Sequence, residues 1–523
     1  MAKKAAPKKQ KSMEETLWDS ANKLRGTVES SEYKHVVLGL IFLKFVSDKF
    51  EARREEMIAD GEQDFIDMQE FYASKNIFFL TEESRWSYII DNAKQDDIAL
   101  KIDTALHTIE KNNKTLKGAL PDNYFSRLNM DVSKLASLLD TINDIDTIKD
   151  EQQDIVGRVY EYFLSKFAIA EGKGKGEFYT PKSIVNLIAE MIEPYKGVIY
   201  DPACGSGGMF VQSMKFIENH HGNKKEVSIY GQEYTATTYK LAKMNLAIRG
   251  IAANFGAVPA DTFGKDQHKD LKADYIMANP PFNQKDWRAS DELTDDPRWA
   301  GYETPPTSNA NYAWILNMAS KLSQNGVAGF ILANGALSGG GEEYKIRKQL
   351  IENNLVEAIC VLPQNMFYTT NISVTLWVLN NNKRERVVVH PDETRNYRNR
   401  EEEILFMDLR EMGEPFEKKY IQFNQEEHIR KIAATYHDWQ QNPDFKDVPE
   451  YCFGATKADV AKKDYSLVPS KYIEFVNRDE NIDFDTKMTT LKGEFKELLE
   501  AENKSKADLL NVFNELGYKI ELD

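Results

Sequence analysis

The sequence contains little cysteine and no pattern typical of a metal site. Its 523 residues include three cysteines, Cys204, Cys360 and Cys452, which lie far apart along the chain. This spacing excludes a disulfide framework and the paired cysteines of a zinc site. The eight histidines show no HExxH spacing, so we expect a protein that needs no metal.

Long hydrophobic runs are also missing. The longest one, residues 36–46 (VVLGLIFLKFV), is interrupted by Lys44 and is shorter than the roughly 18 residues that a membrane span needs. The first residues, MAKKAAPKKQKS, are basic, but no apolar segment follows them, which argues against a secretory signal. We therefore expect a cytoplasmic protein with no membrane association, in which residues 1–12 form a basic disordered tail.

Basic residues are outnumbered by acidic ones. Lysine and arginine number 67 against 83 acidic residues, so the net charge is −16 and the pI is about 5.2. A protein that binds DNA by itself usually presents a basic face, because contacts with phosphates supply most of the non-specific affinity. The composition thus argues against a self-sufficient DNA-binding protein, and no segment looks like a domain that reads a DNA sequence. The acidic composition remains compatible with a subunit that acts on DNA together with a partner.

The first third of the chain is predicted to be helical. Residues 13–24, 36–46, 132–144 and 154–168 carry apolar side chains at helical spacing, and strand-like alternation is scarce. We expect an α-helical N-terminal domain over residues 13–170. It ends at a Gly/Lys-rich stretch that runs into EFYTP, for which a flexible linker is the plainest interpretation.

Strand and helix patterns alternate in the next part of the chain, which we assign to one α/β domain over residues 171–385. The expected strands are residues 197–203, 227–233, 253–258, 274–280, 326–334, 356–362 and 373–379. Helical stretches, including residues 236–250 and 311–324, separate most of them, so we expect βαβ units and a doubly wound parallel sheet. The last two strands are joined by a short loop and are predicted to be antiparallel neighbours.

The remaining residues are predicted to extend this domain and to end in a helix. Residues 386–480 form the extension, in which the polar stretch 380–403 reads as an exposed loop and residues 425–441 as a helix. Residues 481–523 hold the last helix, predicted over 485–516. Its apolar stripe fits self-packing and a partner-facing surface equally well.

A glycine-rich turn follows the first strand. Residues 201–208 (DPACGSGG) lie between that strand and a predicted helix, where a ligand can approach bare backbone N–H groups. The turn differs from GxGxxG and lacks the lysine of a phosphate loop, which argues against ATP. It suits a ligand that carries a carboxylate and an amino group, although a tight structural turn is the alternative.

Polar side chains end four successive strands. Asp201, Glu233, Asp261 and Asn279 stand at strand ends, and ligands of open α/β sheets bind at the carboxyl ends of the strands. Glu233 is placed to accept hydrogen bonds from ribose hydroxyls, and Asp261 to accept one from an adenine amino group. Residues 279–282 (NPPF) form a stiff elbow, because each proline fixes φ near −65°. By itself such an elbow can simply end a strand.

Together these motifs resemble the S-adenosylmethionine-dependent amino-methyltransferases. The pair DPACGSGG and NPPF is similar to the cofactor and catalytic motifs of N6-adenine DNA methyltransferases, and EFYTP (177–181) to their additional cofactor motif. With residues 31–51, 297–315 and 361–379, the chain resembles the modification (HsdM-type) subunits of type I restriction-modification systems over roughly residues 13–475.

The resemblance implies a Rossmann-like, seven-stranded methyltransferase core with an α-helical N-terminal domain and a helical C-terminal extension. It implies metal-free transfer of a methyl group from S-adenosyl-L-methionine to N6 of adenine in a specific site of double-stranded DNA. The implied partners are a specificity subunit that reads the DNA, a second copy of the chain in a complex of two such chains with one specificity subunit, and a restriction subunit. We expect the C-terminal helix to dock on the specificity subunit.

The resemblance also implies roles for individual residues. The cofactor would be bound by Glu177, Phe178, Tyr179, Thr180, Pro181, Lys182, Asp201, Ala203, Gly205, Ser206, Gly207, Gly208, Glu233 and Asp261. The catalytic residues would be Asn279, Pro280, Pro281 and Phe282, which would hold a flipped base. Two alternatives stay open: methylation of another planar amine or amide (protein glutamine, RNA guanine or cytosine N4), and a catalytically silent scaffold.

Overall fold

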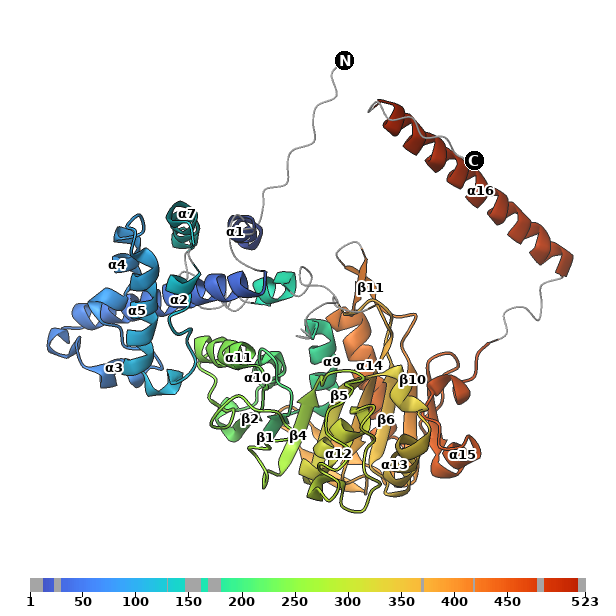
Figure 1. Cartoon of the computed structure of the whole chain (residues 1–523). Helices are drawn as coiled ribbons and strands as arrows, with labels where there is room; N and C mark the ends of the chain where they lie inside the picture. Colours follow the sequence, from blue (N-terminus) through green and yellow to red (C-terminus); the bar gives the residue numbers. More distant parts are fainter. Residues whose placement is uncertain are drawn as a thin grey trace. The chain divides into compact units, whose positions relative to one another are not determined.

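The computed structural model describes most of the chain. The described residues are 13–22, 30–128, 130–145, 161–167, 180–367, 371–416, 419–476 and 484–515. The chain divides into two compact units, Met1–Ile473 and Glu474–Asp523. The first unit holds the helical region and the sheet, and the second holds one long helix (Figure 1).

The regular elements among the described residues before 168 are all helices, as the sequence predicts. The helices are α1 (Met13–Asn22), α2 (Ser30–Ala59), α3 (Gln69–Ala73), α4 (Trp86–Asp91), α5 (Ile98–Asn112), α6 (Tyr124–Arg127) and α7 (Val132–Asn143), and residues 161–167 are helical too. The apolar run 36–46 lies in α2 and is buried against the other helices. Within the described ranges, no helix is long and apolar enough to span a membrane.

A nine-stranded sheet forms the centre of the α/β region that follows the helices. Its order is β13-β10-β6-β7-β5-β4-β1-β2-β3. The strands are β1 (Gly197–Asp201), β2 (Val227–Gly231), β3 (Ala253–Asn254), β4 (Ala273–Ala278), β5 (Leu322–Ala333), β6 (Val356–Val361), β7 (Val374–Asn380), β10 (Glu403–Asp408) and β13 (Cys452–Thr456). The seven predicted strands are all present, and β7 runs antiparallel to β5 and β6, as expected.

Two predictions about the sheet need correction. The sheet continues past the seven-stranded core, because β10 pairs parallel with β6 and β13 pairs antiparallel with β10. The C-terminal extension is therefore not purely helical. The third strand, predicted over residues 253–258, is only two residues long, whereas β5 begins four residues before its predicted start.

The polar stretch 380–403 is not simply an exposed loop. It contains the antiparallel hairpin of β8 (Arg386–Val389) and β9 (Thr394–Tyr397), and Arg400 is fully buried. Buried arginine is found where a carboxylate compensates it, and Glu357 does so from the neighbouring strand β6. The density of charged residues made this segment look solvated, because its compensating partner lies 43 residues away.

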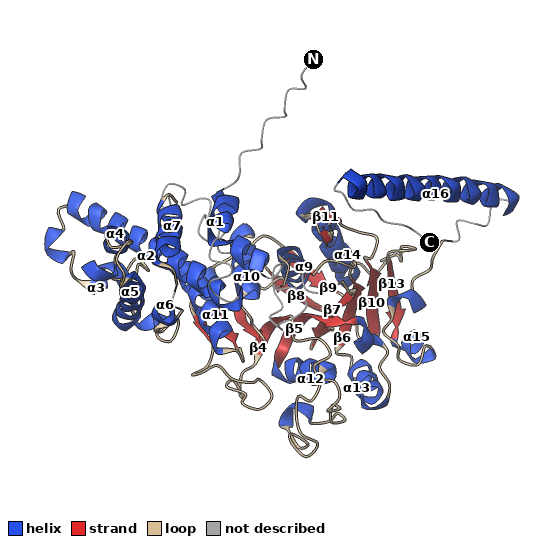
Figure 2. Cartoon of the chain, turned by 45° about the horizontal axis from the view of Figure 1, so that its top comes forward, coloured by secondary structure: helices blue, strands red, loops and turns tan. Residues whose placement is uncertain are grey.

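Helices cover both faces of the sheet (Figure 2). The helices α9 (Lys182–Ile192), α10 (Gly208–Asn219), α11 (Ala236–Ile248) and α14 (Arg430–Gln441) contribute to one apolar core. The helices α12 (Asn311–Lys321) and α13 (Gly341–Glu352) contribute to the other. Because both faces are covered, every residue of β6 and β7 is buried, which explains their continuous apolar sequences.

The helical region packs against the sheet region through α11. Leu241, Met244 and Ile248 of α11 belong to the apolar core of the N-terminal helices. Beside them, Lys240 Nζ donates to the Leu120 carbonyl at 3.0 Å and Lys243 Nζ to the Lys117 carbonyl at 2.9 Å. The helix that follows the second strand thus joins the two regions of the first unit.

The second unit contains the helix α16 (Phe484–Glu515), close to the range predicted for it. Many of its apolar side chains are exposed to solvent within the chain: Phe484, Met488, Leu491, Phe495, Leu498, Leu499, Leu509 and Val512. Most of them recur at three- and four-residue intervals, so they form a stripe along one face.

Candidate functional site

The glycine-rich turn leads from β1 directly into α10. Gly205 and Gly207 adopt φ values of +54° and +79°, a left-handed conformation that strongly favours glycine. Gly207 is the N-cap of α10, and a Cβ added to Gly208 would meet no atom within 4 Å. The start of α10 therefore presents backbone N–H groups beside open space, an arrangement suited to a carboxylate.

Asp201 ends β1 and is almost completely buried. Its Oδ1 accepts a hydrogen bond from the Ala203 N–H at 3.0 Å, which holds the start of the turn. Burial raises the pKa of Asp201 to about 8, and the nearby charge of Glu233 adds to the increase. This carboxyl group is therefore mostly protonated at neutral pH.

Glu233 follows β2 and contacts the same turn. Its two carboxylate oxygens accept hydrogen bonds from Gly205 N–H at 3.1 Å and Thr235 N–H at 2.8 Å. The next predicted acid, Asp261, accepts from Gly264 N–H at 2.8 Å and so closes a turn of its own. The Glu233 carbonyl accepts from Ala260 N–H at 2.9 Å, which joins the two acidic segments.

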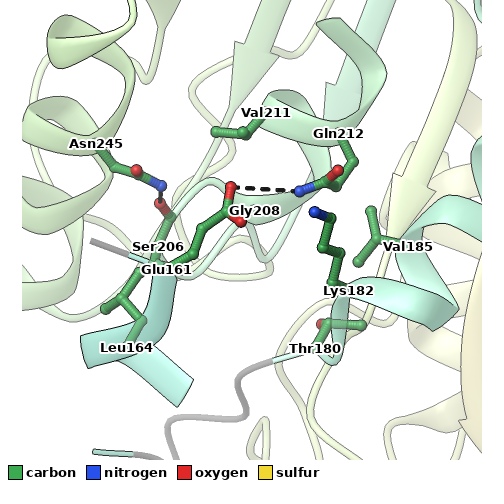
Figure 3. Close-up of a pocket in the computed structure, with 10 residues that line it drawn as sticks. All are labelled: Glu161, Leu164, Thr180, Lys182, Val185, Ser206, Gly208, Val211, Gln212 and Asn245. Carbon is green, nitrogen blue, oxygen red and sulfur yellow. Dashed lines mark hydrogen bonds between the residues drawn. The ribbon is translucent and has the colours of Figure 1, made fainter. Parts of the chain in front are cut away.

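A cavity opens at the start of α10 (Figure 3). It is open to solvent, and the empty space within it, open solvent included, is about 320 Å³. Its lining residues are Glu161, Leu164, Thr180, Lys182, Val185, Ser206, Gly208, Val211, Gln212 and Asn245. Four of the predicted cofactor residues meet here: Thr180, Lys182, Ser206 and Gly208.

The other predicted cofactor residues in the described part of the chain do not line this cavity. Asp201, Ala203, Gly205, Gly207, Glu233 and Asp261 are not among the lining residues of this cavity, and Pro181 is buried beside it as the N-cap of α9. Glu177, Phe178 and Tyr179 fall outside the described residues. The cavity thus corresponds to one part of the predicted site, next to the glycine turn, rather than to all of it.

Sequence reasoning missed several lining residues, above all Glu161. Its Oε1 accepts from Gln212 at 3.5 Å and lies 3.2 Å from Lys215 Nζ and 3.4 Å from Arg249 Nη2. These contacts hold residues 161–167 against α10 and α11. Asn245, also missed, donates to the Ser206 carbonyl at 2.7 Å and so fixes the turn. The contacts of Glu161 and Asn245 join segments that are far apart in the chain, so no local sequence pattern predicts them.

Asn279 stands directly after β4 and is 8% exposed. Its Nδ2 donates to Thr180 Oγ1 at 3.0 Å. Its Oδ1 is buried and accepts no hydrogen bond from the described part of the chain. An unsatisfied buried acceptor costs about 1–3 kcal/mol. Such a group in a native protein calls for an explanation, and a ligand that donates to it supplies one.

Phe367 contacts the end of the NPPF elbow, and α12 holds the residue that follows it. Phe282 packs edge to face with the buried Phe367, at 5.8 Å between ring centroids. The next residue, Asn283, has φ +52° and exchanges two hydrogen bonds with Asn311: its N–H donates to Asn311 Oδ1 at 3.0 Å, and Asn311 Nδ2 donates to Asn283 Oδ1 at 2.9 Å. This reciprocal pair fixes the exit of the elbow.

The cysteine of the glycine turn is unsuited to act as a nucleophile. Cys204 is buried, and burial together with Asp201 and Glu233 raises the pKa of its thiol well above the ordinary value. A thiol that stays protonated attacks poorly. Over the described residues, no three or more His, Cys, Asp or Glu side chains gather in a way that could hold a metal ion.

Comparisons with known proteins agree on one family. The family model described as N-6 DNA Methylase matches residues 151–481, and the HsdM N-terminal domain model matches residues 13–144. The chain is 42% identical over 435 residues to the type I restriction enzyme HindI methylase subunit of Haemophilus influenzae, covering 82% of this chain and 94% of that protein. It is 35% identical to the MjaIX methylase subunit of Methanocaldococcus jannaschii, covering 97% and 91%.

A solved structure shows the same fold. The type I restriction-modification methyltransferase subunit from Streptococcus thermophilus superposes with a TM-score of 0.72 at 23% identity, covering 88% of this chain and 99% of that one.

Proposed function

Because the chain belongs to the N-6 DNA methylase family, as the methylase subunit of a type I restriction-modification system, we propose that it methylates N6 of adenine in double-stranded DNA. The methyl donor is S-adenosyl-L-methionine. One observation carries the assignment to the site: the buried Asn279 Oδ1, without a partner in the described structure, beside a cavity at the glycine turn. The other acceptors considered, such as glutamine or cytosine N4, are not favoured by the relatives.

The cavity at the glycine turn suits the methionine part of the cofactor. The carboxylate would bind the N–H groups at the start of α10 and approach Lys182, and the open space above Gly208 allows this close contact. Glu233 would hold the ribose and Asp261 the adenine, next to the turn. The cofactor residues we propose are Glu177, Phe178, Tyr179, Thr180, Pro181, Lys182, Asp201, Ala203, Gly205, Ser206, Gly207, Gly208, Glu233 and Asp261. When bound, the cofactor supplies an activated methyl group on a sulfonium.

Asn279 and Pro280 make the target amine reactive. The amino group of adenine is a poor nucleophile, because its lone pair is delocalised into the ring. Hydrogen bonds from its two N–H groups to Asn279 Oδ1 and to the Pro280 carbonyl favour a pyramidal nitrogen and localise the lone pair. These bonds strengthen as the nitrogen becomes pyramidal, so they stabilise the transition state more than the bound substrate.

The prolines and Phe282 position the base. Pro280 and Pro281 restrict the backbone of the elbow, so the two acceptors need little reorganisation during transfer. Phe282 is half-buried and offers a ring for stacking. A base within a duplex cannot reach this elbow, so the target adenine must be flipped out of the helix.

A separate specificity subunit supplies the DNA recognition. The net charge of −16 leaves the chain poorly suited to bind DNA alone. We propose a cytoplasmic complex of two copies of this chain with one specificity subunit, which a restriction subunit joins for cleavage. The exposed apolar stripe of α16 is the surface that we assign to the specificity subunit. The domain boundaries at residues 170, 385 and 480 stay predictions.

The catalytic assignment is tested by Asn279→Ala in the complex expressed with its neighbouring genes. Removing one preorganised hydrogen-bonding group typically lowers kcat by about 10²- to 10³-fold. We expect N6-methyladenine in DNA with the wild-type complex, a loss of that order with Asn279→Ala, and retained binding of S-adenosylmethionine. Normal methylation by Asn279→Ala would refute the mechanism, and absence of cofactor binding by the wild type would favour a silent scaffold.

The docking assignment is tested by removing residues 481–523 and, separately, by replacing Leu491, Phe495 and Leu498 with serine. Each change should abolish co-purification with the specificity subunit while the first unit keeps its melting temperature. The matched control replaces Lys496 and Glu500, an ion pair on another face of the same helix. Assembly that survives the truncation would show that α16 is not the docking surface.

A further inference from the structure

The orientation of the Asn279 amide decides what the elbow offers to a base. The Oδ1 and Nδ2 ends of an asparagine side chain are nearly equal in size, so a rotation of 180° exchanges an acceptor for a donor. In the flipped orientation the amide would present N–H groups to the N–H groups of the substrate. Rapid transfer therefore requires a neighbouring group that distinguishes the two ends.

Thr180 is that neighbouring group. Its Oγ1 accepts the hydrogen bond from Asn279 Nδ2 at 3.0 Å, while Asn279 Oδ1 is buried without a partner among the described residues. The bond satisfies the donor end of the amide and leaves the acceptor end available. Thr180 lies just before α9, and 99 residues separate it from Asn279.

Thr180 also lines the cavity at the glycine turn, together with Ser206 and Gly208 (Figure 3). A threonine hydroxyl can accept from an amide N–H or donate to an amide oxygen, so it selects the Nδ2 end only while its own O–H is donated to another acceptor. The cavity, in which we place the cofactor carboxylate, is where that proton would be donated. Thr180 therefore contacts both the cavity in which we place the cofactor and the amide that we place against the base. This double contact makes it the direct link between the two parts of the site.

We propose that Thr180 is a positioning residue, whose hydroxyl, with its own proton directed into the cofactor cavity, holds the Asn279 amide in the orientation that accepts from the target amine. The inference rests on the proposed function and adds to it. The threonine of the EFYTP motif would then act mainly on the base-binding amide, and only secondarily as a part of the cofactor site. Losing the hydroxyl should lower kcat by about 10- to 100-fold, because a misplaced reacting group costs rates of this size.

The test compares Thr180→Val with Thr180→Ser in the assembled complex on duplex DNA that contains its site. Valine keeps the shape of threonine without the hydroxyl, and serine keeps the hydroxyl. We expect Thr180→Val to lower kcat about 10- to 100-fold, with a much smaller change in the Kd for S-adenosylmethionine. Thr180→Ser should restore most of kcat. Equal rates for wild type and Thr180→Val, or a defect confined to cofactor Kd, would overturn the inference.

A double-mutant cycle separates positioning from a general structural effect. If Thr180 acts through the Asn279 amide, Thr180→Val should lower kcat in the wild type but not further in Asn279→Ala. A further loss of the full effect in the Asn279→Ala background would contradict the proposal. The proposed function fails by a different result, the absence of N6-methyladenine with the wild-type complex. The inference fails when that product forms equally well with Thr180→Val.

Discussion

Two buried carboxyl groups lie in the same sheet, one at the edge where β1 ends and the other at the opposite edge, where β6 begins. Asp201 ends β1, at the edge with the glycine turn and the NPPF elbow, whereas Glu357 lies at the start of β6. Both are essentially inaccessible to solvent. Yet the pKa of Asp201 is raised to about 8, and that of Glu357 is lowered below its ordinary value.

The neighbours of the two groups explain the difference. Burial pushes the pKa of Glu357 upward, but the charges of Arg400 and Lys383 and the hydrogen bonds from Asn380 and Gln440 together outweigh it. The Glu357 oxygens accept from Arg400 Nε at 3.0 Å, Asn380 Nδ2 at 2.6 Å and Tyr436 Oη at 3.1 Å. Asp201 accepts from a backbone N–H, and no cation of the described chain offsets its burial, so the pKa rises. The buried charge of Glu357 is thus compensated by cations, whereas Asp201, at the edge where we place the cofactor, lacks a cation and holds a proton instead.

Breaking the buried ion pair of Glu357 and Arg400 should have the largest effect on stability. Arg400→Met leaves Glu357 as a buried carboxylate without its main partner, which typically costs about 3–5 kcal/mol. Chemical denaturation should show a loss of this size in the free energy of unfolding. The control is the pair Glu357→Leu with Arg400→Met, which removes both charges and should recover much of the loss. A single variant as stable as the wild type would show that the ion pair is unimportant.

The two carboxyl groups should respond to pH in opposite directions. Since the folded pKa of Asp201 is about 8, the folded state holds a proton that the unfolded state releases above its ordinary pKa of about 4. The contribution of Asp201 to stability is therefore lost as pH rises from about 4 to 8, with a slope of up to about 1.4 kcal/mol per pH unit. Glu357, whose pKa is lowered, stabilises the fold above its unfolded pKa and loses that contribution as pH falls.

The variant Asp201→Asn separates the contribution of Asp201 to the pH dependence of stability from that of Glu357. Denaturation from about pH 5 to pH 9 should show a flatter stability profile for Asp201→Asn than for the wild type, while the loss of stability below about pH 4.5 remains. Identical profiles in the neutral and alkaline range would mean that Asp201 titrates as an ordinary carboxyl group, and the contrast with Glu357 would disappear.

Local sequence signals predicted the edge with the glycine turn and the NPPF elbow better than the opposite edge. Glycines, prolines and polar residues at strand ends predicted the turn at 201–208 and the elbow at 279–282, because the turn and the elbow both depend on local backbone geometry. The Glu357 site gave no such signal, since Arg400 reaches it from a segment that reads as a solvated loop. The strands β10 and β13 were missed for the same reason: their places in the sheet depend on pairing with distant strands.

The candidate site was also predictable only in part. The motifs named Thr180, Ser206 and Asn279, but the contact between Thr180 and Asn279 joins residues that are 99 positions apart. Glu161 enters the cavity from a helix that precedes the first cofactor motif. Side-chain contacts between distant segments leave no periodic signal in one sequence.

The smallest effect that we predict concerns the neutral side chains that hold the catalytic edge. Where the Glu357 site uses ions, the elbow uses the amide pair of Asn283 and Asn311. Asn311→Ala removes two hydrogen bonds, each worth about 1 kcal/mol, and should lower kcat about tenfold as the elbow loosens. Asn309→Ala is the matched control: it removes a bond of 3.3 Å to the same Asn283 oxygen and a bond of 2.9 Å from Asn311 N–H, but neither side-chain bond of the reciprocal pair, and it should change kcat less. Steady-state rates together with melting temperatures distinguish the two roles: a lower melting temperature with unchanged kcat would make Asn311 a structural residue. A lower kcat with nearly unchanged melting temperature would show that the catalytic edge is ordered by uncharged groups, which leave no buried ion beside the base.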